Sequence, residues 1–418
     1  MVDFKKIISS QGFQQSVITF GGTLVATGIS ALTIILISRM LGPVEFGIFS
    51  LVFAIFSLFI KFGDAGFLYA MQKFVPTARE KSEHEVQQVL QHITGLRWKL
   101  LLLWIPALLL SPVVTWAFQL PAWWIYPAAL IFALIGIWFE HCMSLYQSLH
   151  RFIPAMVMFI SQSALKLLIV GGLIFLGVKS AVSITVIYYL LPLLVLLPFL
   201  FLLKKYLRPT FTFEKELTGR LTQFLRHNSV QVIAIAIADN LDVLIVQLFL
   251  GVYLTGIYGG ISRVAFLFSV LAISLGNVLN IRASRYILKA DRQAFMKKSW
   301  GIVALSVGSC LAVIITAPWL LQYTIGSEYL MALTEFRILT ISSFLLFMTV
   351  PFSSLFYSIE YPQYFSRVGW LLSGTLILFD LLLIPVFGLM GAAVARIISR
   401  VVVMILTWKE WKRLVVKN

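Results

Sequence analysis

Long apolar stretches alternate with short polar or Gly- and Pro-containing breaks along the whole chain. Each stretch approaches or exceeds about 20 residues, the length that an α-helix needs to cross the hydrocarbon core of a bilayer. The pattern predicts an all-α membrane protein with about twelve transmembrane helices. These helices are expected near residues 14–38, 44–68, 97–119, 122–145, 153–177, 180–203, 228–250, 254–280, 299–322, 332–358, 364–385 and 389–408.

The basic residues gather on one side of these predicted helices. If the N-terminus is cytoplasmic, most of the 33 lysines and arginines fall in cytoplasmic segments, and only Arg39 and Lys179 fall in outer connections. Cytoplasmic loops of membrane proteins are enriched in Lys and Arg, so both termini are predicted to be cytoplasmic. The net charge of +16 is then mainly a sign of topology, and no nucleic-acid partner is expected.

The composition supports a membrane protein and argues against metal or redox chemistry. Hydrophobic residues make up 60% of the chain and charged residues 12%, which is more apolar surface than one soluble core could bury. Cys142 and Cys310 lie far apart in hydrophobic stretches, where we expect them to pack between helices. The first apolar run is too long for a cleavable signal peptide and is expected to remain. Neither a metal nor a bound cofactor is expected.

A short motif recurs at an offset of half the chain length. Residues 41–49, LGPVEFGIF, resemble residues 250–258, LGVYLTGIY, and both segments fall in the outer turn between the first two helices of a half. Leu-Gly and Gly-Ile pairs are common in membrane turns, so the alternative is that the two segments resemble each other by coincidence. The same offset also aligns two polar stripes, Thr19, Ser30 and Thr33 on the first helix with Asn228, Asp239 and Asp242 on the seventh.

These correspondences predict a parallel internal repeat of six helices each. The two halves, residues 1–209 and 210–418, are expected to form pseudo-symmetric lobes with a cavity between them. The first and seventh helices would then face each other across that cavity.

Several segments together resemble the polysaccharide transporter family. They are residues 39–47 (RMLGPVEFG), 63–67 (GDAGF), 256–258 (GIY) with Asp242 and Arg263, and 388–395 (GLMGAAVA). That family includes the Wzx-type flippases of the multidrug/oligosaccharidyl-lipid/polysaccharide superfamily.

The resemblance implies a function as well as a fold. Such proteins turn undecaprenyl-pyrophosphate-linked oligosaccharides, such as units of lipopolysaccharide O-antigen, from the cytoplasmic to the periplasmic leaflet by alternating access. The chain is therefore expected to lie in a bacterial inner membrane. Its expected partners are the lipid-linked glycan, membrane lipids and the polymerase and chain-length machinery.

Charged side chains inside the predicted helices are the candidate functional groups, because they are costly in a membrane without a partner or a watery cavity. Asp242 and Arg263 lie at similar depth on either side of one turn, as do Asp380 and Arg396 around Gly388. Two structural ion pairs across hairpins are expected from these depths. Arg263, Arg396 and Lys61 are also candidates for contact with substrate in the cavity.

Lys166 and Arg400 have no acid at the same depth in their hairpins. They sit near mid-membrane in different halves, so they could hold a pyrophosphate between them. The alternative is that each faces Tyr, Ser or backbone groups within its own lobe.

Acidic residues are the candidates for coupling transport to H⁺ or Na⁺. Asp239 and Asp242 lie three residues apart on the polar stripe of the seventh helix, and Asp64 lies near the cytoplasmic end of the second. Lys61 and Asp64 are interpreted either as a solvated pair at the rim or as a substrate gate. Residues 77–91 are charged and amphipathic, which predicts an interfacial helix.

A membrane glycosyl polymerase or ligase is the main alternative from another class. Such an enzyme needs acid, base or metal-binding groups on a large outer loop, whereas the longest outer connection, near 322–331, offers only Glu328 as an acid. We therefore expect a transporter and no enzyme. Within transporters, a multidrug exporter or a lipid II flippase of the same superfamily remains an alternative.

Overall fold

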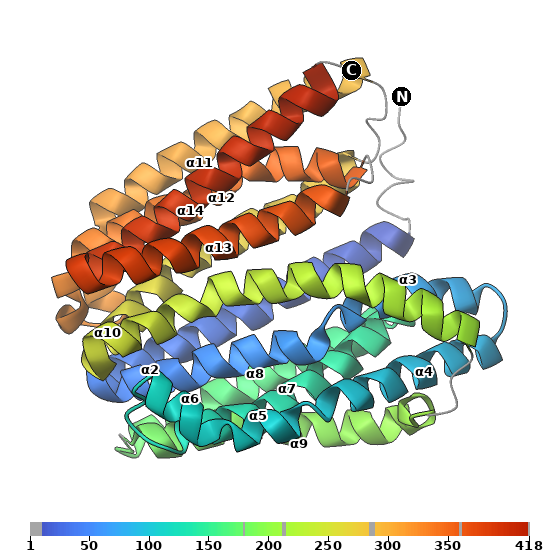
Figure 1. Cartoon of the computed structure of the whole chain (residues 1–418), viewed down its shortest axis with the longest axis horizontal. Helices are drawn as coiled ribbons and strands as arrows, with labels where there is room; N and C mark the ends of the chain where they lie inside the picture. The colour runs from blue at the N-terminus through green and yellow to red at the C-terminus, as the bar shows by residue number, and fades with distance from the viewer. Residues whose placement is uncertain (1–10, 179, 211–214, 284–288, 359–361, 417–418) are drawn as a thin grey trace. The chain divides into compact units, whose positions relative to one another are not determined.

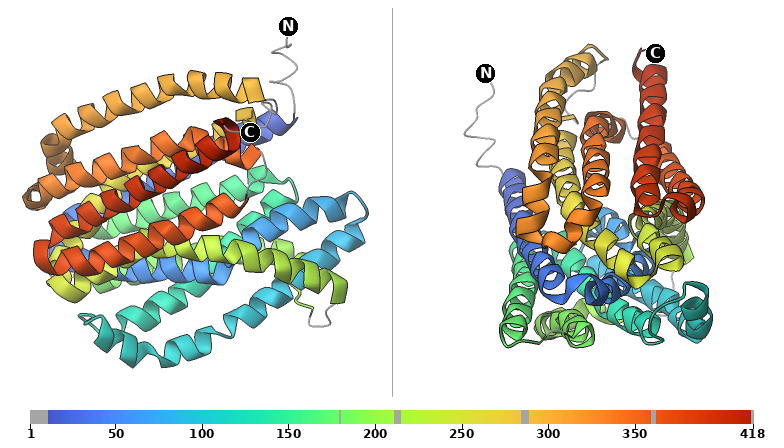
Figure 2. Two further views of the ribbon diagram at one scale, coloured as in Figure 1. Left: turned by 45° about the horizontal axis from the view of Figure 1, so that its top comes forward. Right: turned by 90° about the vertical axis from the view of Figure 1, so that its left-hand side faces the viewer.

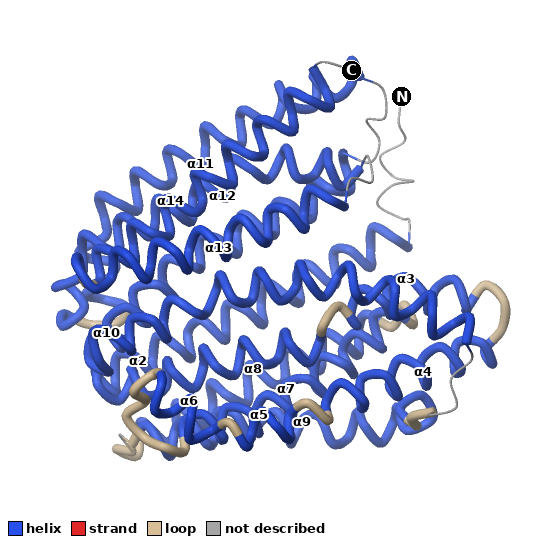
Figure 3. Tube along the Cα trace, in the orientation of Figure 1, coloured by secondary structure: helices blue, strands red, loops and turns tan. Residues whose placement is uncertain are grey.

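A computed structural model describes residues 11–178, 180–210, 215–283, 289–358 and 362–416 (Figure 1). Five of the 33 lysines and arginines counted in the charge argument lie outside these ranges: Lys5, Lys6, Lys179, Arg285 and Lys417. Within the described ranges the secondary structure is helical and contains no strand (Figure 3). The all-α prediction is confirmed.

The first half of the chain contains the helices from α2 to α9. Their bounds are α2 (Gln11–Asp64), α3 (Phe67–Arg79), α4 (Glu83–Leu101), α5 (Trp104–Leu109), α6 (Ser111–Ala117), α7 (Ile125–Ser148), α8 (Phe152–Phe175) and α9 (Ala181–Leu207). The second half contains α10 (Lys215–Ala283), α11 (Lys289–Thr324), the 3₁₀ turn η1 (Ser327–Ala332), α12 (Leu333–Ser358), α13 (Pro362–Phe387), α14 (Leu389–Trp411) and the π-helical turn η2 (Lys412–Val416).

Many of these helices are long and apolar enough to cross a membrane. Among the described residues nine helices meet this criterion, or ten if the bent segments Glu83–Leu109 and Ser111–Ala117, which meet at 60°, form one span. Large apolar side chains on their outer faces remain exposed, for example Leu168 at 72% and Phe175 at 90%, as lipid-facing positions require. The chain is a multi-pass membrane protein. The number of twelve spans and the orientation of the termini stay predictions.

Two helices contain a sharp break at the glycine of the repeated motif. Gly42 has φ 71° and ψ 171°, and Gly251 has φ 80° and ψ 176°. A residue with a side chain rarely adopts this conformation, so glycine is required at both turns. The arms of α2 on either side of Gly42 are about 46 Å and 33 Å long at 1.5 Å per residue, and each could cross a bilayer alone.

The interfacial helix predicted over residues 77–91 is not one continuous helix, and its position at the membrane surface stays a prediction. The chain instead ends α3 at Arg79 and begins α4 at Glu83, and Ser82 between them has an extended backbone. The Ser82 hydroxyl accepts a hydrogen bond from the amide of Glu85 at 3.2 Å. Ser82 followed three residues later by Glu85 matches the capping box that starts a helix, and this local signal outweighs the amphipathic pattern.

The described contacts divide the chain into two compact units. The first comprises Met1–Ile37, Ile55–Thr115 and Trp123–Val232, and the second comprises Ser38–Ala54, Trp116–Ala122 and Ile233–Asn418. Segments therefore change unit around the first glycine turn. The division into transport lobes at residues 209 and 210 stays a prediction.

Each unit has its own buried core. In the first unit, Met71 of α3, Leu90 of α4 and Cys142 of α7 belong to one cluster of buried side chains. In the second unit, Cys310 of α11 packs in a cluster with Phe344 and Phe347 of α12. Both cysteines are free and buried, as expected of packing residues.

In the second unit, α13 and α14 form a close pair on either side of Gly388. They run side by side in Figures 1 and 2, where they are orange-red and red. Gly391 of α14 lies so near the carbonyl of Leu383 that a Cβ there would overlap it. This close pairing brings the charged residues of α14 into the interior of the unit.

Candidate functional site: charged groups inside the membrane helices

Asp242 of α10 is the centre of a buried polar cluster in the second unit. Its carboxylate pairs with Arg396 of α14, with 2.5 Å between Oδ2 and Nη2. The Tyr258 hydroxyl also donates to Oδ2, and the backbone amide of Val243 donates to Oδ1 at 2.9 Å. Asp242 is completely buried, so these partners offset the cost of removing its charge from water.

The partner of Asp242 differs from the one predicted. Arg263 was expected to pair with it because the two share a depth across one hairpin. Instead, Arg263 donates to the Ser50 hydroxyl at 2.6 Å and to the Gly259 carbonyl at 3.3 Å. Equal depth does not make two side chains point toward each other, because each residue turns the direction of a helix by about 100°.

Aromatic rings surround the Arg263 guanidinium. Its Cζ atom lies 4.5 to 5.8 Å from the ring centroids of Phe46, Phe49 and Phe53. Such cation–π contacts are favourable where water is scarce. Arg263 therefore joins the first hairpin turn to α10 inside the second unit, and its role as a substrate contact stays a prediction.

Asp380 of α13 also differs from its prediction, which paired it with Arg396. The side chain is completely buried, and neither carboxyl oxygen has a hydrogen-bond partner among the described residues. Nε of Arg396 is likewise without one, although its Nη2 contacts Asp242. The charges of Asp242 and Arg396 both act on Asp380 electrostatically. A buried carboxyl without hydrogen bonds can bind a proton or a small cation. It could also replace the Asp242 carboxylate as the ion-pair partner of Arg396.

Asp239 and Arg400 lie about one helical turn from Asp242 on α10 and from Arg396 on α14, respectively. Both are partly buried, and the charge of Asp239 acts on Arg400. Asp239 and Asp242 lie three residues apart on α10, and their charges act on Arg400 and Arg396, which lie four residues apart on α14. We call these four side chains the charge ladder. Arg400 does have an acidic neighbour, on α10 instead of within its own hairpin.

In the first unit, two ion pairs involve charged residues at the end of α2. Nζ of Lys61 lies 3.0 Å from Glu140 of α7, and Asp64 lies 3.0 Å from Nη2 of Arg97 of α4. A solvated pair of Lys61 with Asp64 was one of two interpretations, and each residue instead has an ion-pair partner on another helix. The physical reason is again the direction of the side chains around the helix. Those of Lys61 and Asp64 contact Glu140 of α7 and Arg97 of α4. The other interpretation, a substrate gate, stays a prediction.

Arg97 was missed as a membrane-embedded group, since the sequence placed it in a cytoplasmic segment. Its side chain is only 1% exposed, and its guanidinium lies 4.9 Å from the ring of Phe67. Asp64 also accepts a hydrogen bond from the amide of Leu68 at 3.1 Å, in the first turn of α3. The signal that could have revealed Arg97 is the run from residue 86 to 96 before it, which contains no Asp, Glu, Lys or Arg and repeats apolar residues with a helical period.

Lys166 faces an aromatic side chain in its own unit. Its ammonium nitrogen lies 4.0 Å from the ring centroid of Tyr188 on α9, and the residue is 6% exposed. This contact matches the alternative interpretation, in which Lys166 has a partner within its own lobe. Lys166 and Arg400 belong to different units, and a joint contact with a pyrophosphate stays a prediction. Among the described residues, no three His, Cys, Asp or Glu side chains gather to hold a metal ion.

Known proteins were compared with the chain at the level of sequence. The family described as "Polysaccharide biosynthesis protein" matches residues 13–280, well over half of the chain. This match confirms the resemblance drawn from the motifs. No curated protein matches the chain.

Solved structures with a similar fold are membrane transporters. An inward-facing multidrug resistance MATE family transporter of the MOP superfamily has a TM-score of 0.76 at 14% identity, covering 96% of this chain and 99% of that one. The lipid II flippase MurJ in an inward closed conformation has a TM-score of 0.72 at 17% identity, covering 96% and 87%. An outward-facing MATE family transporter has a TM-score of 0.66 at 14% identity, covering 98% and 97%. At these identities the likeness establishes the fold.

Proposed function

Because the chain belongs to the polysaccharide biosynthesis protein family, we propose that it is a flippase for a lipid-linked oligosaccharide. The substrate is an undecaprenyl-pyrophosphate-linked repeat unit, and it moves from the cytoplasmic to the periplasmic leaflet of a bacterial inner membrane by alternating access. The transporter fold shared with the MOP superfamily supports the transport step.

The charge ladder is the observation that best supports a mechanism. Arg396 forms an ion pair with Asp242, and the charge of Asp239 acts on Arg400, in helices where an unpaired charge is costly. A pyrophosphate could replace those carboxylates, because guanidinium groups bind phosphate oxygens through two parallel hydrogen bonds. Arg400 is the candidate to make this contact first, since it is only partly buried and Arg396 is already engaged with Asp242.

Release of the arginines needs a cation on the carboxylates. With Asp380, the described cluster has three acidic side chains and two arginines, so it carries one acid in excess. One H⁺ or Na⁺ would balance that excess, and a second would free an arginine for the substrate. Binding of the cation and binding of the pyrophosphate would then be coupled through a shared ion pair. Asp239, Asp242 and Asp380 are the groups proposed to carry the cation.

The proposed partners follow from this function. They are the lipid-linked glycan, the surrounding lipids, and the polymerase and chain-length proteins that would use the glycan after transfer. A multidrug exporter and a lipid II flippase share the fold and would be the alternatives.

Transfer of the glycan across a bilayer is the deciding experiment. The full-length protein would be reconstituted into liposomes with a fluorescent undecaprenyl-pyrophosphate oligosaccharide, and accessibility of the glycan to an external hydrolase would report its transfer. We expect faster transfer with this protein than in empty liposomes, and no such effect on lipid II. Transfer of lipid II alone, or export of cationic dyes alone, would contradict the proposal.

A further inference from the structure

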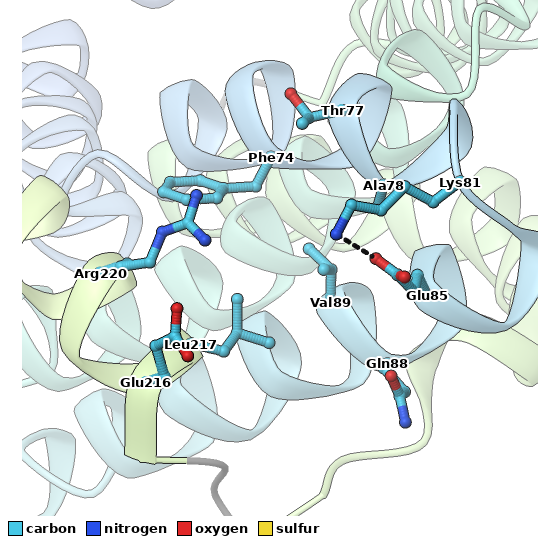
Figure 4. Close-up of a pocket in the computed structure, with 10 residues that line it drawn as sticks. All are labelled: Phe74, Thr77, Ala78, Lys81, Glu85, Gln88, Val89, Glu216, Leu217 and Arg220. Carbon is cyan, nitrogen blue, oxygen red and sulfur yellow. Dashed lines mark ion pairs between the residues drawn. The ribbon is translucent and has the colours of Figure 1, made fainter.

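A cavity of about 320 Å³ lies in the first unit, away from the membrane-embedded charges (Figure 4). Its walls come from the end of α3, the first turns of α4 and the first turns of α10. This volume is at the lower end of the range in which small-molecule sites are found. It could hold a small, compact ligand group.

The lining combines apolar surface with hydrogen-bonding groups. Phe74, Val89 and Leu217 supply the apolar part, and Glu216 and Arg220 supply the charged hydrogen-bonding groups. Thr77 and Gln88 also line the cavity, but the Thr77 hydroxyl donates to the Lys73 carbonyl and the Gln88 amide contacts His84. Figure 4 shows Glu216 and Arg220 of α10 on one side of the cavity, and Lys81 and Glu85 on the other.

The charges of the cavity balance. Lys81 and Glu85 form an ion pair at 3.2 Å and neutralise each other. Glu216 and Arg220 lie one helical turn apart, and neither forms an ion pair among the described residues. The cavity therefore offers one carboxylate that can accept hydrogen bonds and one guanidinium that can donate them, with no excess of positive charge. This balance does not suit a polyanion such as a free pyrophosphate.

A neutral ring that carries several hydroxyl groups fits such a lining. Hydroxyls can donate to the Glu216 carboxylate and accept from the Arg220 guanidinium, and the C–H face of the ring can pack on the apolar side chains. Sugars have this combination of a polar edge and an apolar face. A lipid phosphate has only the acceptor half of it.

The cavity lies beside the segment that follows α9. This segment belongs to the basic central loop, which carries Lys204, Lys205, Arg208, Lys215, Arg220 and Arg226. Tyr206 at the end of α9 donates to Glu83 of α4 at 2.6 Å, and the amide of Thr210 donates to the Gln91 carbonyl at 3.3 Å. The predicted orientation puts this loop in the cytoplasm, the side on which the glycan is assembled in the proposed function.

We infer that this cavity is a saccharide site that binds a sugar of the glycan headgroup before transfer, with Glu216 and Arg220 as its hydrogen-bonding residues. The inference rests on the proposed function for the identity of the glycan. It adds a docking site at the membrane surface that is separate from the pyrophosphate contacts.

Binding of soluble glycan tests the inference directly. The probe is the host's own oligosaccharide repeat unit, released from its lipid by mild acid, and calorimetry would measure its binding to the full-length protein in lipid nanodiscs. Glu216→Gln and Arg220→Gln should each weaken binding about tenfold, because each removes a charged hydrogen-bonding partner. Both positions are exposed, so the variants should fold. Lys215→Gln, an exposed neighbour outside the cavity lining, is the matched control and should bind as the wild type does.

The remaining outcomes separate this inference from the proposed function. Inorganic pyrophosphate and nanodiscs rich in anionic lipid serve as competing probes. If pyrophosphate binds in place of the glycan and Arg220→Gln abolishes it, or if both variants bind glycan normally, the saccharide site is wrong. If the protein transfers the lipid-linked glycan but binds no soluble glycan, the site is wrong and the flippase stands. Glycan binding that is lost in both variants, without any transfer, supports the site and contradicts the flippase.

Discussion

Gly47 and Gly256 occupy equivalent positions in the two copies of the repeated motif, and each packs against the backbone of the other copy. A Cβ at Gly47 would overlap the carbonyl oxygen of Val252, and a Cβ at Gly256 would overlap that of Pro43. Pro43 and Val252 are themselves equivalent positions. The two turns therefore meet in a reciprocal contact of the kind made by a two-fold symmetric interface.

Alanine at either glycine should disrupt this contact. Gly47→Ala and Gly256→Ala are each expected to lower the free energy of unfolding by about 1 to 3 kcal/mol, because backbone atoms cannot move aside as a side chain would. Thermal unfolding of the purified protein would measure the change. Gly374→Ala is the control, since a Cβ at this helical position in α13 meets nothing within 4 Å. Equal melting temperatures for all three variants would contradict the contact.

Asp242 and Arg396 should depend on each other for stability. Asp242→Asn leaves the Arg396 guanidinium without its partner, and breaking a buried pair typically costs about 3 to 5 kcal/mol. The charge-swapped double variant Asp242→Arg with Arg396→Asp should recover much of the protein that either single swap loses. The swap of Asp242 with Arg263 should not. The amount of tagged protein in the membrane would test both swaps. If only the swap with Arg263 recovered the protein, the result would support the predicted pairing of Asp242 with Arg263 instead.

Asp380→Asn should behave differently from Asp242→Asn. Because neither oxygen of Asp380 accepts a hydrogen bond from the described residues, the amide should leave the melting temperature unchanged or raise it. If Asp380 carries the coupling cation, transfer by this variant should no longer respond to an imposed pH or Na⁺ gradient. Liposome assays with and without each gradient would measure the response. A strongly destabilised Asp380→Asn protein would indicate a missing partner.

The Arg97–Asp64 and Lys61–Glu140 ion pairs of the first unit should contribute unequally. Arg97→Met leaves the buried Asp64 carboxylate without its ion-pair partner. It should lower the free energy of unfolding by about 3 to 5 kcal/mol. Lys61→Met should cost less than Arg97→Met, because the Lys61 and Glu140 side chains are 41% and 33% exposed, whereas those of Arg97 and Asp64 are 1% and 8% exposed. The double variant Arg97→Met with Asp64→Leu should regain stability over Arg97→Met alone. Chemical unfolding of the wild type and the three variants would measure these free energies. Equal losses of stability for Arg97→Met and Lys61→Met would contradict the expected order.

Arg400 and Lys166 can be distinguished by conservative changes. Arg400→Lys keeps the charge but loses the bidentate geometry, so transfer of the lipid-linked glycan should fall by roughly tenfold or more while abundance stays normal. Lys166→Met removes the ammonium over the Tyr188 ring but keeps an unbranched side chain of similar length, and it should slow transfer only if the ammonium meets substrate. Wild-type transfer by the double alanine variant would remove both residues from the substrate path.

The sequence by itself determined the class of the protein and much of its local structure. Hydrophobic run length depends only on the chain and the bilayer thickness, so the apolar stretches predicted helices long enough to span. The glycines at 42 and 251 marked two equivalent breaks because few other residues adopt their backbone conformation. The family resemblance also followed from these short motifs.

Only the tertiary structure decided which charges meet. Depth along a helix follows from counting residues, whereas the direction of a side chain around the helix has meaning only once the neighbouring helix is known. Asp242 therefore pairs with Arg396 of α14 and Asp64 with Arg97 of α4, although nearer residues in the sequence carried suitable charges. The cavity beside Arg220 likewise forms where α10 lies against the consecutive helices α3 and α4, which are distant from it in sequence, and no local pattern could have indicated it.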